Sequence, residues 1–287
     1  MPLSPFVAIC RARGNTSADQ VSGGELPCYG DDDNPHRRAF LVHTINNPIG
    51  NHLRRGSLRQ ARRNLIAYCT ARQAAGKALP LMGTGSRGPA TIMTSVLDAQ
   101  TLFFWVYDYP ELMRRFRDIL AQKMVELNIT LREFSGNTQP GWWITDDNSA
   151  LFNRKLYAQY CVPVLETVLE ALAPGNAYRY QHSDSAMGHL LDFQYNLGIR
   201  GVNYGPEVDA ALIRAKMPDA MIHGQLPPLL LRNDSPQEIE KRIRGDFRKA
   251  GGTGGLTITT AGSLAAGTGV GRMRWMMQIV QEHCRYD

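Results

Sequence analysis

The sequence predicts an α/β protein of the TIM-type (β/α)8 barrel class, with N-terminal strands that are abbreviated or distorted. After residue 78, six short apolar runs are each followed by a stretch with helical periodicity. Strands separated by helices pair in parallel through right-handed crossovers. The length of 287 residues also suits one barrel, which takes about 250 residues.

The first two predicted units lie between residues 79 and 172. A strand over Leu79–Met82 leads into a glycine-rich turn, and a helix over about 110–132 follows, with apolar residues spaced by three and four. The second strand covers Trp142–Thr145, and its helix covers Asn153–Leu172. Pro163 interrupts that helix and should kink it, because proline cannot donate a backbone hydrogen bond.

Four further units complete the pattern. The predicted strand and helix pairs are Tyr178–Gln181 with Met187–Leu197, Val202–Tyr204 with Asp209–Lys216, Met221–His223 with a helix from Ser235, and Leu256–Thr260 with Val270–His283. Ser235 is a suitable N-cap, since Pro236 fits the first helical turn and Glu238 provides the acid of a capping box.

Residues 1–77 form a basic segment that we expect to supply the first strands, and residues 78–287 form the main part of the barrel. Phe6–Ile9 and Phe40–Ile45 are the candidate strands in this segment. Asn15–Asn34 contains a glycine pair and three consecutive aspartates, which is typical of a long loop.

An acid-free stretch extends from Asn34 to Leu97. It carries ten basic residues: Arg37, Arg38, Arg54, Arg55, Arg59, Arg62, Arg63, Arg72, Lys77 and Arg87. Such a stretch could dock a carboxylate, a phosphate or an acidic protein, or it could be the solvated face of a helix. Few aromatic residues accompany it and no nucleic-acid-binding signature occurs, so we expect no nucleic-acid partner.

The five cysteines are scattered and form no C-x-x-C pair. A reducing compartment is the simplest interpretation, and no apolar run reaches the roughly 18 residues of a membrane span. We therefore expect a cytoplasmic protein without a membrane partner. The sequence leaves the oligomeric state open.

Gly83, Gly85 and Gly88 match the spacing G-x-G-x-x-G. A dinucleotide-binding site would also need an acidic residue about 20 positions further on, after a second strand. Asp98 follows too soon, so nucleotide binding is disfavoured. Phosphate-binding GK[ST] loops, G-x-S-x-G elbows and H-E-x-x-H zinc motifs do not occur in the sequence.

Polar residues gather where predicted strands end, which is where β/α barrels carry their chemistry. Asp146, His182, Asp184 and His223 are the candidate catalytic residues, and Asp147, Tyr204, Gln225 and Arg87 are the candidate substrate-binding residues. Histidine and carboxylate pairs can exchange protons or bind a metal. The alternative is structural: single histidines serve as hydrogen-bond donors, and an Asp-Asp-Asn run can form a turn and a helix cap.

A series of short motifs resembles the uroporphyrinogen decarboxylase superfamily between about residues 78 and 284. The matching stretches are Gly88–Thr94, Tyr107–Leu112, Thr145–Asp147, Tyr157–Pro163, His182–Asp184, His223–Pro228 and Ser235–Ile239. This superfamily contains the heme-pathway decarboxylases and the corrinoid-dependent methyltransferases. The resemblance implies a β/α barrel and accounts for Pro163, which falls in the same helix across the family.

The departures from the family patterns separate these branches. The decarboxylases carry an N-terminal Arg-Gln-Ala-Gly-Arg stretch that is absent here, a tyrosine where this chain has Ser95, and Gly-His-Gly where it has Ala261-Gly262-Ser263. The thiol-activating methyltransferases bind zinc through His-x-Cys and a later cysteine. Here His182-Ser183-Asp184 and the region of Ser263 lack those cysteines, so we assign no metal ligands. Zinc stays an alternative, because a harder His/Asp site could still hold a metal.

The resemblance therefore implies methyl transfer from an O-methyl or N-methyl substrate, a branch that need not activate a thiol. The acceptor would be a corrinoid (cobalamin) on a separate partner protein, since this chain has no Asp-x-His-x-x-Gly cobalamin-binding motif. Two alternatives remain: a uroporphyrinogen-type decarboxylase, and a diverged or non-enzymatic binding member of the superfamily.

Overall fold

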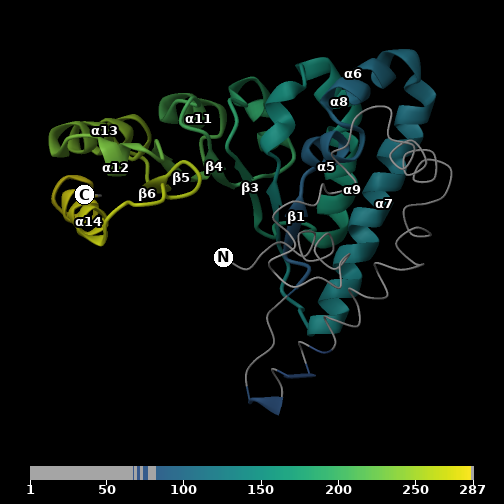
Figure 1. Cartoon of the computed structure of the whole chain (residues 1–287), viewed down its shortest axis with the longest axis horizontal. Coiled ribbons are helices and arrows are strands. Elements are labelled where there is room, and N and C mark those ends of the chain that lie inside the picture. Colours follow the sequence, from purple (N-terminus) through teal and green to yellow (C-terminus); the bar gives the residue numbers. More distant parts are fainter. Residues whose placement is uncertain (1–66, 68–69, 72–73, 77–81, 286–287) are drawn as a thin grey trace, which may run out of the picture. The chain divides into compact units, whose positions relative to one another are not determined.

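A computed structural model describes residues 67, 70–71, 74–76 and 82–285 of the chain. The chain divides into two compact units between Gln139 and Pro140 (Figure 1). The predicted strands Phe6–Ile9 and Phe40–Ile45 and the predicted loop Asn15–Asn34 lie outside the described residues. The expected boundary at residues 77 and 78 also falls next to undescribed positions, so it stays a prediction.

Residues 82–139 of the first unit contain one short strand and three helices. These are β1 (Gly85–Arg87), α5 (Pro89–Leu97), α6 (Ala99–Asp108) and α7 (Pro110–Ser135). Helix α7 confirms the helix predicted over 110–132, and Met113, Phe116, Leu120 and Met124 form its buried face. It ends at Gly136, whose φ of 65° is the left-handed conformation that glycine adopts at low cost.

The first strand lies later than the sequence predicted. Residues 79–81 are outside the described part, Met82 is not in a strand, and β1 runs through the G-x-G-x-x-G motif. The chain before β1 is held by the end of α7. Arg132 Nε donates to the carbonyl of Gly83 at 2.8 Å, and Asn137 Nδ2 donates to that of Met82 at 2.8 Å.

Asp98 follows the G-x-G-x-x-G motif too closely to be a nucleotide ligand, and the structure shows that it caps a helix instead. Its carboxylate caps α6 by accepting hydrogen bonds from the backbone N–H and the hydroxyl of Thr101, each at 2.8 Å. Capping of this kind satisfies a helix N–H group that would otherwise lack a partner.

The second unit contains a parallel sheet of five strands in sequence order. They are β2 (Trp142–Thr145), β3 (Arg179–Ser183), β4 (Gly201–Tyr204), β5 (Met221–Leu226) and β6 (Leu256–Thr260). Figure 1 shows β3 to β6 side by side with α11 and α13 alongside them. The α/β class and the parallel order confirm the predicted fold class, and the described strands of this unit do not close into a barrel.

Two strands end later than predicted, and the difference changes the position of the candidate site. The strand predicted to end at Gln181 continues to Ser183, and the strand predicted to end at His223 continues to Leu226. The extra residues pair with neighbouring strands, since His182 is opposite both Thr145 and Asn203, and Gln225 is opposite Thr259. His182, His223 and Gln225 therefore lie within strands rather than after them.

The connecting helices follow the predicted order. They are η2 (Asp147–Leu151), α8 (Arg154–Tyr160), α9 (Val162–Leu172), η3 (Gly188–Leu190), α10 (Leu191–Asn196), α11 (Ala210–Lys216), α12 (Leu230–Asn233), α13 (Pro236–Ala250) and α14 (Val270–His283). Pro163 does not kink one long helix. It lies in the first turn of α9, where a missing N–H costs least, so the predicted helix is two helices.

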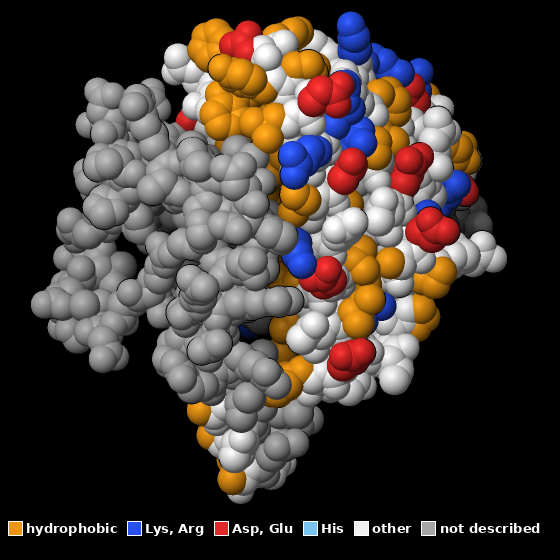
Figure 2. Space-filling view, turned by 90° about the vertical axis from the view of Figure 1, so that its right-hand side faces the viewer, with side chains coloured by type: hydrophobic (Ala, Val, Ile, Leu, Met, Phe, Trp, Pro, Cys, Tyr) orange, Lys and Arg blue, Asp and Glu red, His pale blue; other side chains and the backbone are white. Residues whose placement is uncertain are grey.

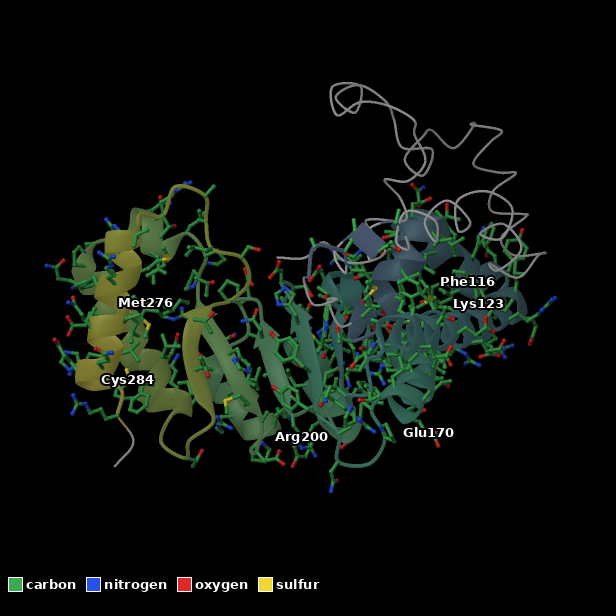
Figure 3. All side chains as sticks on the ribbon, turned by 90° about the horizontal axis from the view of Figure 1, so that it is seen from below. Phe116, Lys123, Glu170, Arg200, Met276 and Cys284 are labelled. Carbon is green, nitrogen blue, oxygen red and sulfur yellow. The ribbon has the colours of Figure 1, made fainter. Side chains whose placement is uncertain are left out.

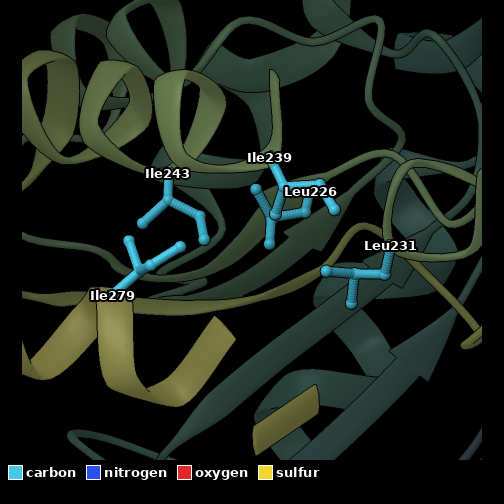
Figure 4. Packing of buried hydrophobic residues seen from close by; sticks show 5 residues of the cluster. All are labelled: Leu226, Leu231, Ile239, Ile243 and Ile279. Carbon is cyan, nitrogen blue, oxygen red and sulfur yellow. The ribbon is translucent and has the colours of Figure 1, made fainter. Parts of the chain in front are cut away.

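An aliphatic cluster packs α12, α13 and α14 against the end of β5. Leu226, Leu231, Ile239, Ile243 and Ile279 are buried and face one another in Figure 4. Met276 and Cys284 are partly buried against this cluster, and both are labelled at α14 in Figure 3. Ser235 caps α13 by accepting from the N–H of Glu238, as predicted.

Most of the acid-free stretch lies outside the described residues, so its docking role stays a prediction. On the face shown in Figure 2, basic and acidic side chains of the described part lie next to one another. None of the described helices is long and apolar enough to span a membrane.

Candidate active site

His182 is the centre of a polar cluster at the carboxyl end of β3. Its Nε2 atom lies 3.2 Å from Asp184 Oδ1 and 3.9 Å from Asp147 Oδ1. Its Nδ1 atom lies 2.8 Å from Asn203 Oδ1 on the neighbouring strand β4. The imidazole is thus held on one side by an amide and faces two carboxylates on the other.

Asn203 connects this cluster to the two strands beyond it. Its Nδ2 donates to the carbonyls of His223 and, at 3.1 Å, of Thr260. Its Oδ1 also accepts from the backbone N–H of Gly262 at 3.1 Å. A single side chain therefore links β3 and β4 to β5 and to the turn after β6.

Two glycines leave room for Asp184. A Cβ atom at Gly262 would lie 2.3 Å from Asp184 Oδ1, and a Cβ atom at Gly205 would lie 2.5 Å from the carbonyl oxygen of Asp184. Both distances are far shorter than a van der Waals contact, so larger residues would displace the aspartate. Gly262 also has a φ of 104°, which favours glycine.

Asp147 reaches the cluster from η2, which follows β2. Its Oδ1 accepts a hydrogen bond of 3.1 Å from the backbone N–H of Asp184. The side chains of His182, Asp147 and Asp184 are 23%, 31% and 56% exposed, so the cluster is open to a ligand.

The same three side chains offer ligand atoms that lie within 4.8 Å of one another. One nitrogen and two carboxylate oxygens suit a hard divalent cation better than a thiophilic one. The two described cysteines, Cys161 and Cys284, are not among these atoms. No metal ligands were assigned from the sequence, and the structure brings Asp147 beside His182 and Asp184.

Asp146 is placed differently from its neighbour Asp147. It is fully buried. Its charge, together with the larger effect of burial, raises the pKa values of the Tyr157 hydroxyl and the Cys161 thiol. Both of those groups are also fully buried. The structure therefore brings Asp147 to His182 and places Asp146 among buried groups of the helix layer.

Tyr204 and Gln225, predicted to bind substrate, are fully buried as well. The Tyr204 hydroxyl donates to Gln181 Oε1 at 3.0 Å, and burial raises its pKa well above the usual range. Gln225 Nε2 donates to the carbonyls of Gly205 and Val208 at 3.2 and 2.8 Å. The first of these hydrogen bonds joins β4 to β3, and the other two hold the loop after β4. A role of Tyr204 and Gln225 in substrate binding stays a prediction.

His223 lies on β5, and its carbonyl oxygen accepts from Asn203. Its ring packs edge-on against Tyr180, with ring centroids 5.7 Å apart. Burial lowers the pKa of His223. The structure links His223 to His182 through Asn203, whereas a direct role in the reaction stays a prediction.

Arg87 belongs to β1 in the first unit and is half-buried. Its role in substrate binding stays a prediction.

Asn203, Gly205 and Gly262 contribute to the site but were not predicted as site residues from the sequence. Asn203 could have been found, because alternate residues of paired strands share a face of the sheet. The predicted strand Val202–Tyr204 contained it. Gly262 had no comparable signal, since its importance depends on an approach by Asp184 from a different loop.

The fold and the site define an α/β protein whose polar cluster lies at the carboxyl edge of a parallel sheet, where barrel enzymes carry their active sites. The family model for uroporphyrinogen decarboxylase (URO-D) matches residues 60–283, and the chain belongs to this family. The match includes every residue of the cluster.

A solved structure of a methyltransferase from Methanosarcina mazei is similar to this chain, with a TM-score of 0.57 and 16% sequence identity. The similarity covers 80% of this chain and 66% of that one, so this chain spans less than two thirds of its neighbour's length. At this identity the likeness concerns the fold. No curated protein sequence matches the chain.

Proposed function

We propose that this protein transfers a methyl group from an O-methyl or N-methyl substrate to a corrinoid carried by a separate protein. The observation that carries the proposal is the position of His182 Nε2, which faces Asp147 and Asp184 at an exposed edge of the sheet. Family membership and the methyltransferase fold neighbour support the same class of reaction.

The chemistry requires a proton at the leaving atom. When a methyl group departs from oxygen or nitrogen, the C–O or C–N bond breaks and the heteroatom keeps the electron pair. A proton from His182 Nε2 neutralises that atom, and Asp147 and Asp184 stabilise the imidazolium that supplies it. The corrinoid, when bound, supplies the nucleophile that takes the methyl group.

The carboxylates also argue against the decarboxylase alternative. Uroporphyrinogen is a polycarboxylate, and two acidic side chains beside His182 would repel it. A neutral methyl ether or methylamine meets no such repulsion.

The test is a spectroscopic methylation assay with a reduced corrinoid acceptor and a panel of aryl methyl ethers and methylamines. His182→Gln should lower the rate by about 10²–10⁴-fold, the usual contribution of a general acid. Asp184→Asn should also lower it. His283→Gln is the matched control, because His283 also lies near two carboxylates, Glu240 and Glu282, but at the end of α14.

Three other outcomes would replace the proposal. Full activity of His182→Gln would show that the cluster is not the active site. Release of CO₂ from uroporphyrinogen without methyl transfer would establish the decarboxylase alternative. Neither activity, together with tight binding of a panel compound, would indicate a binding protein. Metal analysis of the same sample decides whether the cluster holds a cation.

A further inference from the structure

We propose that Asn203 is a positioning residue that fixes the tautomer of His182, with the proton on Nδ1, so that Nε2 alone exchanges a proton with the substrate. The role of Nε2 as the reacting atom rests on the proposed function. The tautomer itself does not, because it follows from the hydrogen bonds around one amide group.

Both the nitrogen and the oxygen of the Asn203 side-chain amide have all of their hydrogen-bonding capacity occupied. Its Nδ2 donates to two backbone carbonyls, those of His223 and Thr260. Its Oδ1 lies 2.8 Å from His182 Nδ1 and 3.1 Å from the backbone nitrogen of Gly262. An amide has two donor hydrogens and two acceptor lone pairs, so none of this capacity is left over.

These neighbours determine which way the amide points. A backbone N–H can only donate and a carbonyl can only accept. Rotating the amide by 180° would place its NH₂ group against the Gly262 N–H and its oxygen against two carbonyl oxygens. The orientation with Oδ1 toward Gly262 is therefore required, and His182 Nδ1 meets an acceptor.

An acceptor at Nδ1 means that Nδ1 must carry a hydrogen. In the neutral ring only one nitrogen is protonated, so Nε2 then presents its lone pair to the open side of the cluster. The two carboxylates would favour the opposite tautomer, with the hydrogen on Nε2 bonded to Asp184. Asn203 thus favours the tautomer that the carboxylates disfavour, and it leaves the lone pair of Nε2 free to accept a proton.

His189 provides an internal contrast within the same unit. Its Nε2 lies 2.9 Å from the carbonyl oxygen of Phe152. Because that oxygen can only accept, His189 must carry its hydrogen on Nε2 when neutral. The two histidines therefore have opposite expected tautomers, which can be read in one spectrum.

The experiment is a two-bond ¹H–¹⁵N correlation spectrum of the full chain with ¹⁵N-labelled histidine, recorded at a pH where the rings are neutral. His182→Gln and His189→Gln identify the two signals by their loss. In the wild-type chain, His182 should show a protonated Nδ1 and an unprotonated Nε2, and His189 the reverse. A protonated Nε2 on His182 overturns the inference without any further variant.

Two substitutions separate positioning from a general structural role. Asn203→Ala removes the acceptor, and His182 should switch to the tautomer with its hydrogen on Nε2. Asn203→Asp keeps an oxygen toward Nδ1 and should keep the wild-type tautomer. If Asn203→Ala folds and retains the Nδ1 hydrogen, Asn203 does not set the tautomer and the inference fails. If it does not fold, the spectra of wild type and Asn203→Asp decide.

Kinetics provide a separate measurement where methyl transfer is established. Loss of a group that orients a reactive histidine typically costs about 10–100-fold. We expect Asn203→Ala to lower kcat by this factor with little change in KM, and Asn203→Asp to recover most of the loss. An Nδ1 hydrogen without methyl transfer would contradict the proposed function and leave the tautomer assignment standing.

Discussion

Strands β3 and β4 carry one polar region on each of their two faces, and the two regions differ in their exposure to solvent. His182 and Asn203 point to one face and join the exposed carboxylates of Asp147 and Asp184. Gln181 and Tyr204 point to the other face and are fully buried. Both regions are rich in polar groups, but only the first contains side chains that are open to solvent.

Burial keeps the second region neutral. It raises the pKa values of Tyr157, Cys161 and Tyr204, so these groups retain their protons at ordinary pH. Their hydrogen bonds also join the helices to one another, as between Gln194 Nε2 on α10 and the Tyr157 hydroxyl on α8 at 2.8 Å. The comparison teaches that the face of a strand, rather than the type of residue, separates the candidate site from the core.

The adjacent residues Asp146 and Asp147 give the largest expected contrast. Asp147→Ala should lower methyl transfer by about 10²–10⁴-fold, because it removes a carboxylate that faces the proton donor. Asp146→Ala should instead reduce the free energy of unfolding by about 1–3 kcal/mol, because it leaves a cavity at a fully buried position.

Rate assays and urea denaturation of the two variants measure both effects. The comparison breaks down if Asp146→Ala folds normally and is the variant that loses activity. That result would restore the role that the sequence analysis gave to Asp146.

A pair of glycines gives the next largest effect. Gly262→Ala should lower the rate by about 10²-fold, because its Cβ atom would push Asp184 out of place, and displacements near 1 Å have this cost. Gly254→Ala is the matched control. Gly254 also has a positive φ, 81°, but nothing lies within 4 Å of its added Cβ atom.

Both glycine variants should lose stability by about 1–2 kcal/mol from backbone strain. Only Gly262→Ala should also lose activity under conditions where both variants are folded. Equal rates for the two variants at a temperature where both are folded would show that the position of Asp184 is unimportant.

Much of the fold was predictable because hydrophobic periodicity is a local property. The strands Trp142–Thr145 and Leu256–Thr260 and the helix Val270–His283 match the structure at both ends. Errors arose where pairing with a neighbouring strand extends an element beyond its apolar run. The polar residues His182 and Ser183 belong to β3 because β2 and β4 bond to them.

The grouping of the candidate residues was predictable in part for the same reason. His182, Asp184 and Asp147 were all named as candidates because each lies near the end of an apolar run, and the structure places the three side chains together. The assignment of roles to Asp146 and Tyr204 rested on their position after a strand, which does not say which face a side chain meets. Asn203 was passed over because a position inside a strand resembles core, although its register with His182 places both on one face.

Tyr204 tests the buried face with a smaller effect on stability alone. Tyr204→Phe removes the hydroxyl that donates to Gln181, which leaves a buried acceptor unpaired and should cost about 1–3 kcal/mol. Tyr107→Phe, at a side chain that is 70% exposed, should cost much less. Chemical denaturation measures both, and the methyl-transfer rate of Tyr204→Phe should stay at the wild-type value. A large loss of rate with unchanged stability would instead place Tyr204 in substrate binding.

The smallest expected effect concerns pH and His223. Burial lowers its pKa in the folded protein below the value of about 6.5 that a histidine has in an unfolded chain. As the pH falls below about 6.5, the unfolded chain takes up the proton before the folded chain does. The contribution of His223 to stability is therefore present above about pH 6.5 and is lost progressively below it. His223→Phe keeps a ring against Tyr180 and removes the titration. Between about pH 7 and about pH 5, the stability of this variant should therefore fall less steeply than that of the wild type. Urea denaturation at several pH values gives the two slopes. Equal slopes would mean that the ring is as easily protonated in the folded chain as in the unfolded one, and His223 would then belong with the open cluster rather than with the buried region.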